Sequence, residues 1–534
     1  VAADPRLPVW SGELYLEYHR GTYTAQAHNK RNNRKIELAL RSAELRFLEA
    51  AKYGMAYPAE ALAAIWKDVL TLQFHDILPG SSIRKVYEDS DRMYAACFEK
   101  LGKLCREALE KMLEKDDRAV TVLNDLDFVR SDVVRIPAQG RSVSALAAAD
   151  GSLVPVQRVG DEYVAYVRNL TPMGATTFTV SDEELAADTV RVTREYFETP
   201  FFSGRFDESM RIVSLIDRRV NRELCRPGEK LNRIVCYENR PHNYDAWDVN
   251  IYYNRRRWEV DQVAGVEIVS EGPACAVLRV KYAYSASAIE QELRFYRDLP
   301  RIDFNTRVNW NEEHYLLKAH FPLDVFYNDA TFDVQYGNVR RATHKNTSWD
   351  AARFEVCAHK WMDVSEPDYG VALLNDCKYG HSVDENGLAL TLLKSSTYPD
   401  PKADQGEHEF SYALLPHVGD WREGGVVDAA YAFNCPAEAI PGMRAKDAGA
   451  FVRLEGEGAV VESVKKAEDG DDVIVRLYEC YGRRANVKLI PGFPFAQAHV
   501  CNILEENGEA AAVENGAIAL SLKPYQIVTL RFGR

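Results

Sequence analysis

The chain has 534 residues, 46% of them hydrophobic and 27% charged, which is enough for about three or four globular domains. Its 66 Lys and Arg against 80 Asp and Glu give a formal net charge of −14, which argues against a nucleic-acid partner, because such partners need clustered cations. No apolar run approaches the roughly 20 residues of a membrane span, and the ten scattered cysteines form no CxxC pair. We therefore expect no membrane partner and a reducing, cytoplasmic location.

Three stretches near the start place apolar residues at the three- and four-residue spacing of amphipathic helices. We expect helices over about 29–54, 58–76 and 83–115. Ser81 and Ser82 are good N-cap residues for the third helix, with Ile83 turned inward. Because the connections are short, the three helices should form an antiparallel bundle, and we define the first domain as residues 1–116.

From about Arg118 the apolar period changes to two, with Gly, Asn, Asp and Pro between the runs, which indicates β-structure. The acidic stretch 181–189 is typical of a linker. We therefore predict an α+β multidomain fold in which the bundle is followed by all-β sandwich domains. These are a small β domain over 117–189, a large β-sandwich over 190–445 and a C-terminal β domain over 446–534.

The segment Gln73-Phe74-His75-Asp76 is the one candidate metal motif, since no HxH, HExxH or CxxC is present. On a helix, adjacent side chains point about 100° apart, so His75 could bind a metal while Asp76 meets a substrate hydroxyl. Alternatively, His75 donates to a late helical carbonyl and Asp76 is only exposed. Spacing alone leaves both interpretations open.

Two aromatic and polar clusters, 240–248 and 344–350, resemble sugar-facing loops in the β region. Carbohydrate sites pair an aromatic face with carboxylates and amides that bind hydroxyls, which makes Asp245, Trp247 and Asp248 candidates. The alternative is that the aromatic residues belong to a sandwich core and that their polar neighbours form turns.

The segments Trp10-Ser-Gly-Glu-Leu-Tyr-Leu-Glu-Tyr-His-Arg-Gly-Thr-Tyr-Thr24, Asn29-Lys-Arg-Asn-Asn-Arg34 and Gln73-Phe-His-Asp-Ile-Leu-Pro-Gly-Ser81 resemble those of family 38 α-mannosidases. Asn243-Tyr-Asp-Ala-Trp-Asp248 and Thr343-His-Lys-Asn-Thr-Ser-Trp-Asp350 are similar to its cytosolic-type branch. The resemblance covers nearly the whole chain. It implies that the large sandwich is a super-sandwich of the galactose-mutarotase type.

In the family that this chain resembles, a divalent cation, usually zinc, is held by a His-x-Asp pair, a nucleophilic Asp and a final histidine. That histidine corresponds to His75, and the Asp that follows it, here Asp76, holds substrate hydroxyls. Cobalt is the alternative metal. Within segment 13–24, the resemblance implies that His19, Arg20 and Tyr23 line or brace the sugar cleft, while a packed domain junction is the other interpretation.

The His-x-Asp pair, the nucleophile and the acid/base belong in that family to an amino-terminal α/β barrel, and nothing in this sequence matches them. Retaining glycoside hydrolysis needs two carboxylates about 5 Å apart. We therefore expect the C-terminal part of a retaining α-mannosidase that acts on mannose-containing oligosaccharides, with the metal site complete only with the barrel and this chain inactive alone. The alternatives are a stand-alone carbohydrate-binding sandwich protein and a structural role in a homo-oligomer.

Overall fold

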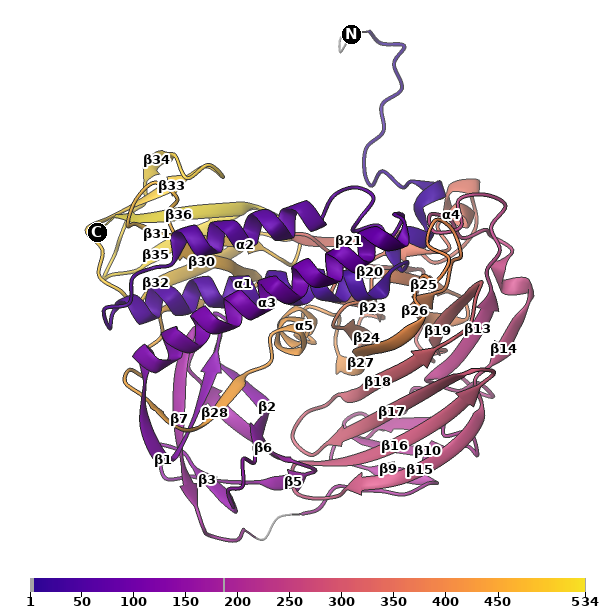
Figure 1. The fold of residues 1–534 in the computed structure, drawn as a ribbon, viewed down its shortest axis with the longest axis horizontal. Coiled ribbons are helices and arrows are strands. Elements are labelled where there is room, and N and C mark those ends of the chain that lie inside the picture. The colour runs from indigo at the N-terminus through magenta and orange to yellow at the C-terminus, as the bar shows by residue number, and fades with distance from the viewer. Residues whose placement is uncertain (1–3, 186–187, 534) are drawn as a thin grey trace.

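The computed structural model describes residues 4–185 and 188–533, and after an extended N-terminal segment three long helices pack together as a bundle (Figure 1). The helices are α1 (Ala27–Ala51), α2 (Ala59–Leu72) and α3 (Arg84–Met112). Their shared core contains Leu40, Phe47, Ile65 and Tyr94, as the apolar spacing predicts. The predicted α+β fold, with a bundle ahead of β-sandwiches, is confirmed. Residues 1–3, 186, 187 and 534, including part of the predicted linker 181–189, lie outside the described residues.

Helix α1 lies between two hydrophobic cores, because residues on its opposite faces belong to different cores. Ile36 and Leu40 face α2 and α3, whereas Leu45 and Leu48 belong to the core of the C-terminal sheets. The buried Arg41 donates to the carbonyls of Val461 and Asp125 at 2.9 and 3.0 Å. Buried guanidinium groups are tolerated only when hydrogen-bonded, so these bonds explain how so polar a helix lies inside.

The small β region contains two sheets, with strand orders β28-β1-β7-β3-β4 and β2-β6-β5. Its strands are β1 (Leu113–Asn124), β2 (Arg130–Pro137), β3 (Ala145–Ala147), β4 (Leu153–Pro155), β5 (Gln157–Val159), β6 (Glu162–Leu170), β7 (Gly174–Ser181) and β28 (Glu438–Ala445). β28 returns to pair antiparallel with β1, with Thr121 opposite Ile440. By hydrogen bonding, residues 438–445 therefore belong to this sheet, although the sequence groups them with the large sandwich.

The large sandwich packs one sheet, β15-β16-β17-β18-β27-β24-β23-β20-β21, against a second, β14-β13-β19-β26-β25-β22. A smaller sheet, β12-β11-β10-β9-β8, joins the same core, where Phe197 stacks on Phe295 of the first sheet with ring centroids 4.0 Å apart. Phe304 of the first sheet and Phe321 of the second have ring centroids 5.8 Å apart, within one continuous core. The strands of the smaller sheet are β8 (Arg191–Val192), β9 (Tyr196–Glu198), β10 (Phe202–Phe206), β11 (Ile212–Asp217) and β12 (Arg222–Glu223). Those of the two main sheets are β13 (Arg233–Glu238), β14 (Arg257–Glu259), β15 (Gln262–Ser270), β16 (Cys275–Tyr284), β17 (Ser287–Tyr296), β18 (Ile302–Trp310), β19 (Tyr315–Phe321), β20 (Asp329–Val334), β21 (Gly337–Ala342), β22 (Val356–Cys357), β23 (Trp361–Ser365), β24 (Tyr369–Asn375), β25 (Gly380–Asp384), β26 (Gly387–Lys394) and β27 (Gly406–Val418).

The C-terminal region again contains two sheets, β29-β32-β35 and β30-β31-β36-β33-β34, which lie beside α1 at the end of the bundle away from the large sandwich (Figure 1). Their strands are β29 (Val452–Glu455), β30 (Ala459–Lys466), β31 (Val473–Glu479), β32 (Ala485–Pro491), β33 (Gln497–Cys501), β34 (Asn507–Ala510), β35 (Ile518–Leu522) and β36 (Ile527–Gly533). The remaining short helices are η1 (Glu17–His19), η2 (Gly21–Tyr23), η3 (Tyr253–Arg255), α4 (Ser348–Ala352) and α5 (Val426–Asn434). Within the described ranges, no helix combines the length and apolar character that crossing a bilayer requires.

Candidate functional site

The loop that carries His75 and Asp76 follows α2 and is not part of it. The sequence predicts a helix to about residue 76, but α2 ends at Leu72 and residues 73–80 form turns. Ser81 and Ser82, predicted N-caps of α3, instead fold the loop: the Ser81 hydroxyl donates to Asp76 Oδ1 at 3.0 Å and the Ser82 hydroxyl to the Asp76 carbonyl at 2.8 Å. The prediction that Ser81 and Ser82 cap α3 is therefore wrong, and so is the predicted end of α2 at about residue 76. Ile83, predicted to turn inward, instead precedes α3 and is exposed.

In this loop the His75 side chain is 74% exposed, and its Nε2 lies 3.3 Å from Asp76 Oδ2. The Phe74 ring, itself exposed, lies beside the imidazole with centroids 4.3 Å apart and the two planes tilted by 43°. Gln73 turns the other way and donates to Glu37 Oε1 of α1 at 2.8 Å. His75 is thus presented to solvent, with a carboxylate beside it.

As a metal site, the loop offers one imidazole and an adjacent carboxylate. Across residues 4–185 and 188–533, no group of three or more His, Cys, Asp and Glu side chains gathers as ligands would. A zinc site needs three or four ligands at about 2 Å. His75 and Asp76 therefore supply too few ligands for a complete metal site and could contribute only part of one.

The loop around Asp245 is held from beneath by buried polar groups. Asp245 Oδ2 accepts from the Thr397 backbone N–H at 2.7 Å, and Lys394 Nζ lies 3.7 Å from Oδ1 and donates to the Asp245 carbonyl. Lys394 is fully buried, and this burial lowers its pKa to about 8. The Asp245 carboxylate thus holds the loop in shape.

Asp248 and Arg20 form a second support for the same loop. Arg20 is 8% exposed, and its guanidinium lies 3.6 Å from Asp248 Oδ1 and donates to the Ala352 carbonyl at 2.8 Å. It also lies over the Phe354 ring, 4.3 Å from the centroid. The Gly21 N–H donates to the Trp247 carbonyl at 2.7 Å. Arg20 therefore joins three distant segments.

His19 and Tyr23 lie in the short helices on either side of Arg20. His19 is partly buried, and its Nδ1 has no hydrogen-bond partner among the described residues. Burial raises the pKa of the Tyr23 hydroxyl, so that group stays neutral. Arg20 thus has the contacts of a bracing residue, while the roles of His19 and Tyr23 stay predictions.

The two loops are connected through the start of α1. The Gly80 backbone, at φ +86°, packs so closely on Ala25 that a Cβ would lie 2.3 Å from the Ala25 carbonyl oxygen. On the other side, the Gln26 N–H donates to Asp404 Oδ2 at 2.9 Å, and the Ala246 N–H donates to the Tyr398 carbonyl at 3.1 Å. The His75 loop, the α1 start, the segment 397–404 and the Asp245 loop are thus linked in succession.

Aromatic side chains surround Trp247 on this surface. Its ring centroid is 6.1 Å from that of Tyr244 and 6.5 Å from that of Tyr398, and both tyrosines are 63% exposed. The sequence does not single out Tyr398, Lys394 or Asp404, because they lie about 150 residues beyond the loop and carry no local motif.

The second predicted sugar-facing cluster, 344–350, has a different arrangement. Thr347 caps α4 by accepting from the Asp350 N–H, while the Asp350 carboxylate accepts from the Thr347 N–H, both at 3.1 Å. This is a capping box. Trp349 is exposed, and its ring lies 6.2 Å from that of Trp10. The polar residues of this cluster therefore stabilise a helix end.

Three domain models match the chain: the alpha mannosidase middle domain over 17–112, the glycosyl hydrolases family 38 C-terminal domain over 197–402, and the family 38 C-terminal beta sandwich domain over 458–530. Alpha-mannosidase 2C1 of Homo sapiens is 33% identical over 543 residues, covering 98% of this chain and 51% of the relative. Alpha-mannosidase G of Dictyostelium discoideum is 30% identical, covering 99% and 53%. The chain thus spans about half the length of these relatives.

Among solved structures, an alpha-mannosidase from Enterococcus faecalis V583 has the same fold, with a TM-score of 0.81 at 16% identity over 99% of this chain and 70% of that one. The predicted resemblance is therefore confirmed from the first loop to the last sheet. The chain belongs to glycosyl hydrolase family 38, of which it contains the middle and C-terminal domains.

Proposed function

We propose that this chain is the C-terminal part of a retaining, metal-dependent α-mannosidase that removes terminal α-mannosyl residues from oligosaccharides. The observation that carries the proposal is the exposed His75–Asp76 pair, linked through the start of α1 to the aromatic loop around Trp247. Relatives named alpha-mannosidase align with 98% or more of the chain.

In this proposal His75 supplies one ligand to a divalent cation, zinc or alternatively cobalt. The exposed imidazole has a free approach from solvent, and Oδ2 of the neighbouring Asp76 lies 3.3 Å from its Nε2. When bound, such a metal polarises and holds sugar hydroxyls. The remaining ligands must come from outside the described residues, so zinc affinity of this chain alone should be weak.

Asp76 is the proposed acceptor for substrate hydroxyls. Its Oδ1 already accepts from Ser81, which holds the carboxylate in place while leaving lone pairs for a sugar. Trp247, with Tyr244 and Tyr398 near it, offers aromatic faces that stack on the C–H groups of a sugar ring. Asp245 and Asp248 take the supporting role described above.

Hydrolysis needs a nucleophilic carboxylate and a proton donor on opposite sides of the glycosidic bond. The Asp245 and Asp248 side chains are only 14% and 12% exposed and support the loop, and Asp76 is assigned to hydroxyl binding, so we place neither catalytic carboxylate in this chain. We therefore propose that the chain binds mannosides weakly and hydrolyses none by itself.

The cytoplasm is the proposed compartment, because all ten cysteines are free thiols, as expected in a reducing environment. The proposed partner is a mannose-containing oligosaccharide, with neither nucleic acid nor a membrane involved. Assembly into a homo-oligomer also stays a proposal.

Saturation-transfer NMR with an α-mannobiose and an aryl α-mannoside hydrolysis assay test this function on the chain as it is. We expect weak transfer to the sugar, reduced by Trp247→Ala but not by Trp349→Ala, and no aryl release. Hydrolysis of the aryl α-mannoside by this chain would contradict the proposal that it lacks the catalytic carboxylates. Absence of any sugar signal would contradict the proposed cleft.

A non-catalytic carbohydrate-binding protein is the second candidate, because the aromatic group around Trp247 could bind a sugar with no metal present. The effect of zinc separates the two. If zinc strengthens mannobiose binding and His75→Ala abolishes that gain, the enzyme proposal is supported, whereas binding that is indifferent to zinc favours the second candidate.

A further inference from the structure

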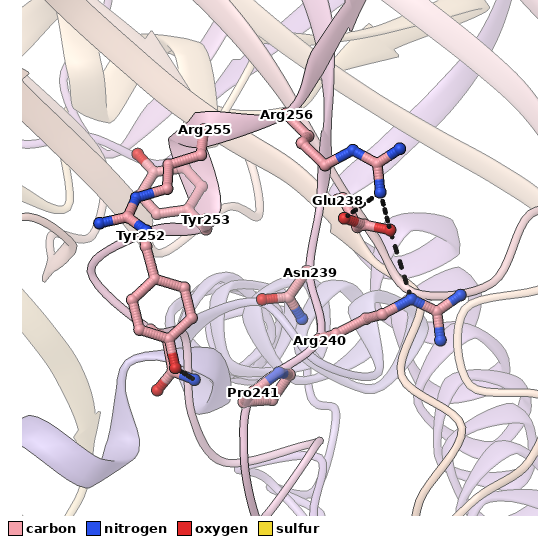
Figure 2. Close-up of a pocket in the computed structure, with 9 residues that line it drawn as sticks. Glu238, Asn239, Arg240, Pro241, Tyr252, Tyr253, Arg255 and Arg256 are labelled. Carbon is pink, nitrogen blue, oxygen red and sulfur yellow. Dashed lines mark hydrogen bonds and ion pairs between the residues drawn. The ribbon is translucent and has the colours of Figure 1, made fainter.

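A small pocket lies between the end of β13 and the turn that leads into β14 (Figure 2). Its volume is about 190 Å³, or about six water-sized volumes at ~30 Å³ each, which limits an occupant to one sugar-sized group. It is lined by Glu238, Asn239, Arg240, Pro241, Asn250, Tyr252, Tyr253, Arg255 and Arg256. Arg240 and Pro241 begin the predicted sugar-facing cluster 240–248, but Asp245, Trp247 and Asp248 of that cluster do not line the pocket.

Asn239 lies between the two sides of this pocket, with Tyr252 and Arg255 on one side and Glu238 with two arginines on the other (Figure 2). The residue is 1% exposed, yet neither Nδ2 nor Oδ1 of its side chain has a hydrogen-bond partner within the described residues. A buried polar group without a partner costs about 1–3 kcal/mol. The buried amide can therefore both donate to and accept from a ligand.

Cations outnumber carboxylates around this amide. Glu238 pairs with two arginines, with Oε2 at 3.1 Å from Arg256 and Oε1 at 3.4 Å from Arg240. Arg255 has no ion pair in the part of the chain that the structure describes, and its guanidinium lies 5.6 Å from the Tyr252 ring centroid. Three guanidiniums and one carboxylate leave a local positive excess in a chain whose net charge is −14.

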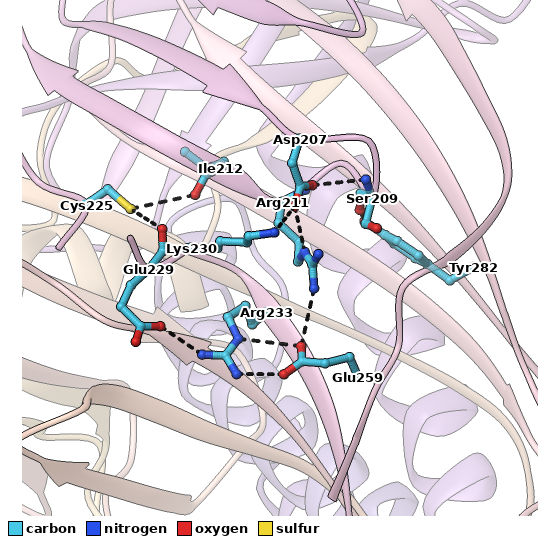
Figure 3. A network of polar contacts seen from close by, with 10 residues as sticks. All are labelled: Asp207, Ser209, Arg211, Ile212, Cys225, Glu229, Lys230, Arg233, Glu259 and Tyr282. Carbon is cyan, nitrogen blue, oxygen red and sulfur yellow. Dashed lines mark hydrogen bonds and ion pairs between the residues drawn. The ribbon is translucent and has the colours of Figure 1, made fainter. Parts of the chain in front are cut away.

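A nearby polar network shows how this domain balances charges that have a structural role (Figure 3). Arg211 and Lys230 both bind Asp207, at 2.9 and 2.6 Å. Arg233 binds Glu259 at 2.6 Å and Glu229 at 3.0 Å. Every cation there has a carboxylate partner, whereas the exposed Arg255 at the pocket has none among the described residues and is therefore available to an anion.

We propose that this pocket binds a small polyol that carries an oxyanion, that is, a sugar-sized phosphate ester or carboxylate. The guanidinium groups, Arg255 foremost, bind the oxyanion, because their forked donors match phosphate and carboxylate oxygens. The Asn239 amide binds a hydroxyl of the polyol, which can satisfy both its donor and its acceptor.

The pocket lies at the stem of the loop that carries Trp247. Pro241 and Asn250, on either side of that loop in sequence, both line the pocket. The Asn239 N–H donates to the His314 carbonyl at 2.7 Å, and the His314 ring lies 3.6 Å from Asp245 Oδ2. An occupant bound to Asn239 would therefore lie one backbone hydrogen bond away from His314, the residue beside the Asp245 carboxylate.

Calorimetric titration of the chain with a hexose phosphate, a hexuronate, the neutral hexose and inorganic phosphate tests the proposal. We expect one or both of the sugar anions to bind, with an affinity that falls as salt rises, and the difference between them identifies the oxyanion. Arg255→Gln should weaken binding about tenfold, which is about 1.4 kcal/mol, because it removes a charged hydrogen bond. Glu238→Gln, which releases two arginines, should strengthen it several-fold.

Two further variants separate a binding role from a structural one. Asn239→Leu should weaken sugar-anion binding without lowering the melting temperature, because the amide has no protein partner to lose. Arg205→Gln, an exposed arginine of β10, is the matched control and should change neither.

Equal affinities for Arg255→Gln, Glu238→Gln and Arg205→Gln would overturn the proposal. Inorganic phosphate that binds as tightly as the sugar phosphate would overturn its polyol part. Because neither zinc nor mannoside turnover enters these titrations, their failure is distinguishable from a failure of the mannosidase proposal.

Discussion

The His75 loop and the Asp245 loop are both aspartate-containing sequence motifs of one proposed sugar site, yet the fold treats them in opposite ways. His75 and Asp76 have side chains 74% and 48% exposed, whereas Asp245 and Asp248 have side chains only 14% and 12% exposed. The first loop presents its polar groups to solvent, and the second uses them for internal support. A motif can thus be specific to a family while its carboxylates serve two different purposes.

The largest expected effect comes from Arg20→Ala, which removes the support of the buried Asp248. Breaking a buried ion pair by removing one partner costs about 3–5 kcal/mol, because the other charge is left without compensation. We expect the urea midpoint of the large sandwich to fall accordingly. The control is Arg84→Ala, whose pair with Glu88 has both side chains about half exposed and should contribute less than about 1 kcal/mol.

If Arg20→Ala and Arg84→Ala lowered the midpoint equally, the Asp245 loop would not depend on internal support. The Asp245 loop could then no longer be distinguished from the His75 loop by its use of buried carboxylates for support.

A pH dependence at Lys394 sharpens the same contrast. Burial lowers the pKa of Lys394 to about 8 from 10.5, so the unfolded chain holds more protons than the folded chain between these values. Stability should therefore rise with pH across that window, by at most about 3 kcal/mol from this group. Lys394→Met should lose this rise.

Urea midpoints at about pH 7.5 and about pH 9.5 measure the effect, with Lys67→Met, an exposed lysine of α2, as the control. The difference in urea midpoint between the variant and the unmodified chain should change between the two pH values for Lys394→Met and stay constant for Lys67→Met. A change of the same size in both variants would argue against a buried lysine under this loop.

The smallest effect on stability is expected for His75→Ala. Its exposed side chain supports nothing else, so the free energy of unfolding should change by less than about 0.5 kcal/mol. Zinc should shift the imidazole NMR signals of the unmodified chain and leave His75→Ala without that response. A zinc response that persists in the variant would place the metal ligand elsewhere.

Sequence periodicity was enough to predict the bundle, because the inward residues of α1 and α2 repeat locally, every three or four positions. Periodicity failed where contacts between residues distant in the sequence, or side-chain hydrogen bonds, determine the local structure. The turn that ends α2 is shaped by Ser81, Ser82 and the Gly80–Ala25 contact, none of which apolar spacing reports. Hydrogen bonding from Ser hydroxyls to Asp76 competes with their use as helix caps.

The candidate site was predictable only in part for the same reason. The motifs mark His75, Asp76 and the Asp245 loop, and a local signal is also enough for the capping box at Thr347. Nothing near Lys394 or Asp404 in the sequence indicates that they reach residues 245 and 26, because such pairings arise from sheet packing between distant segments. Exposure, which separates a presented carboxylate from a supporting one, likewise depends on the whole fold.

The return of β28 to β1 determines when the molecule can finish folding. Arg444 of β28 donates to the Asp116 carboxylate of β1 at 2.7 Å, and the two residues are 328 positions apart in the sequence. During synthesis the small sheet must wait with an open edge until the large sandwich has emerged from the ribosome. The large sandwich is thus inserted in the sequence between β7 and β28, the two strands that border β1, and a cut anywhere within it would leave β1 and β28 on different fragments.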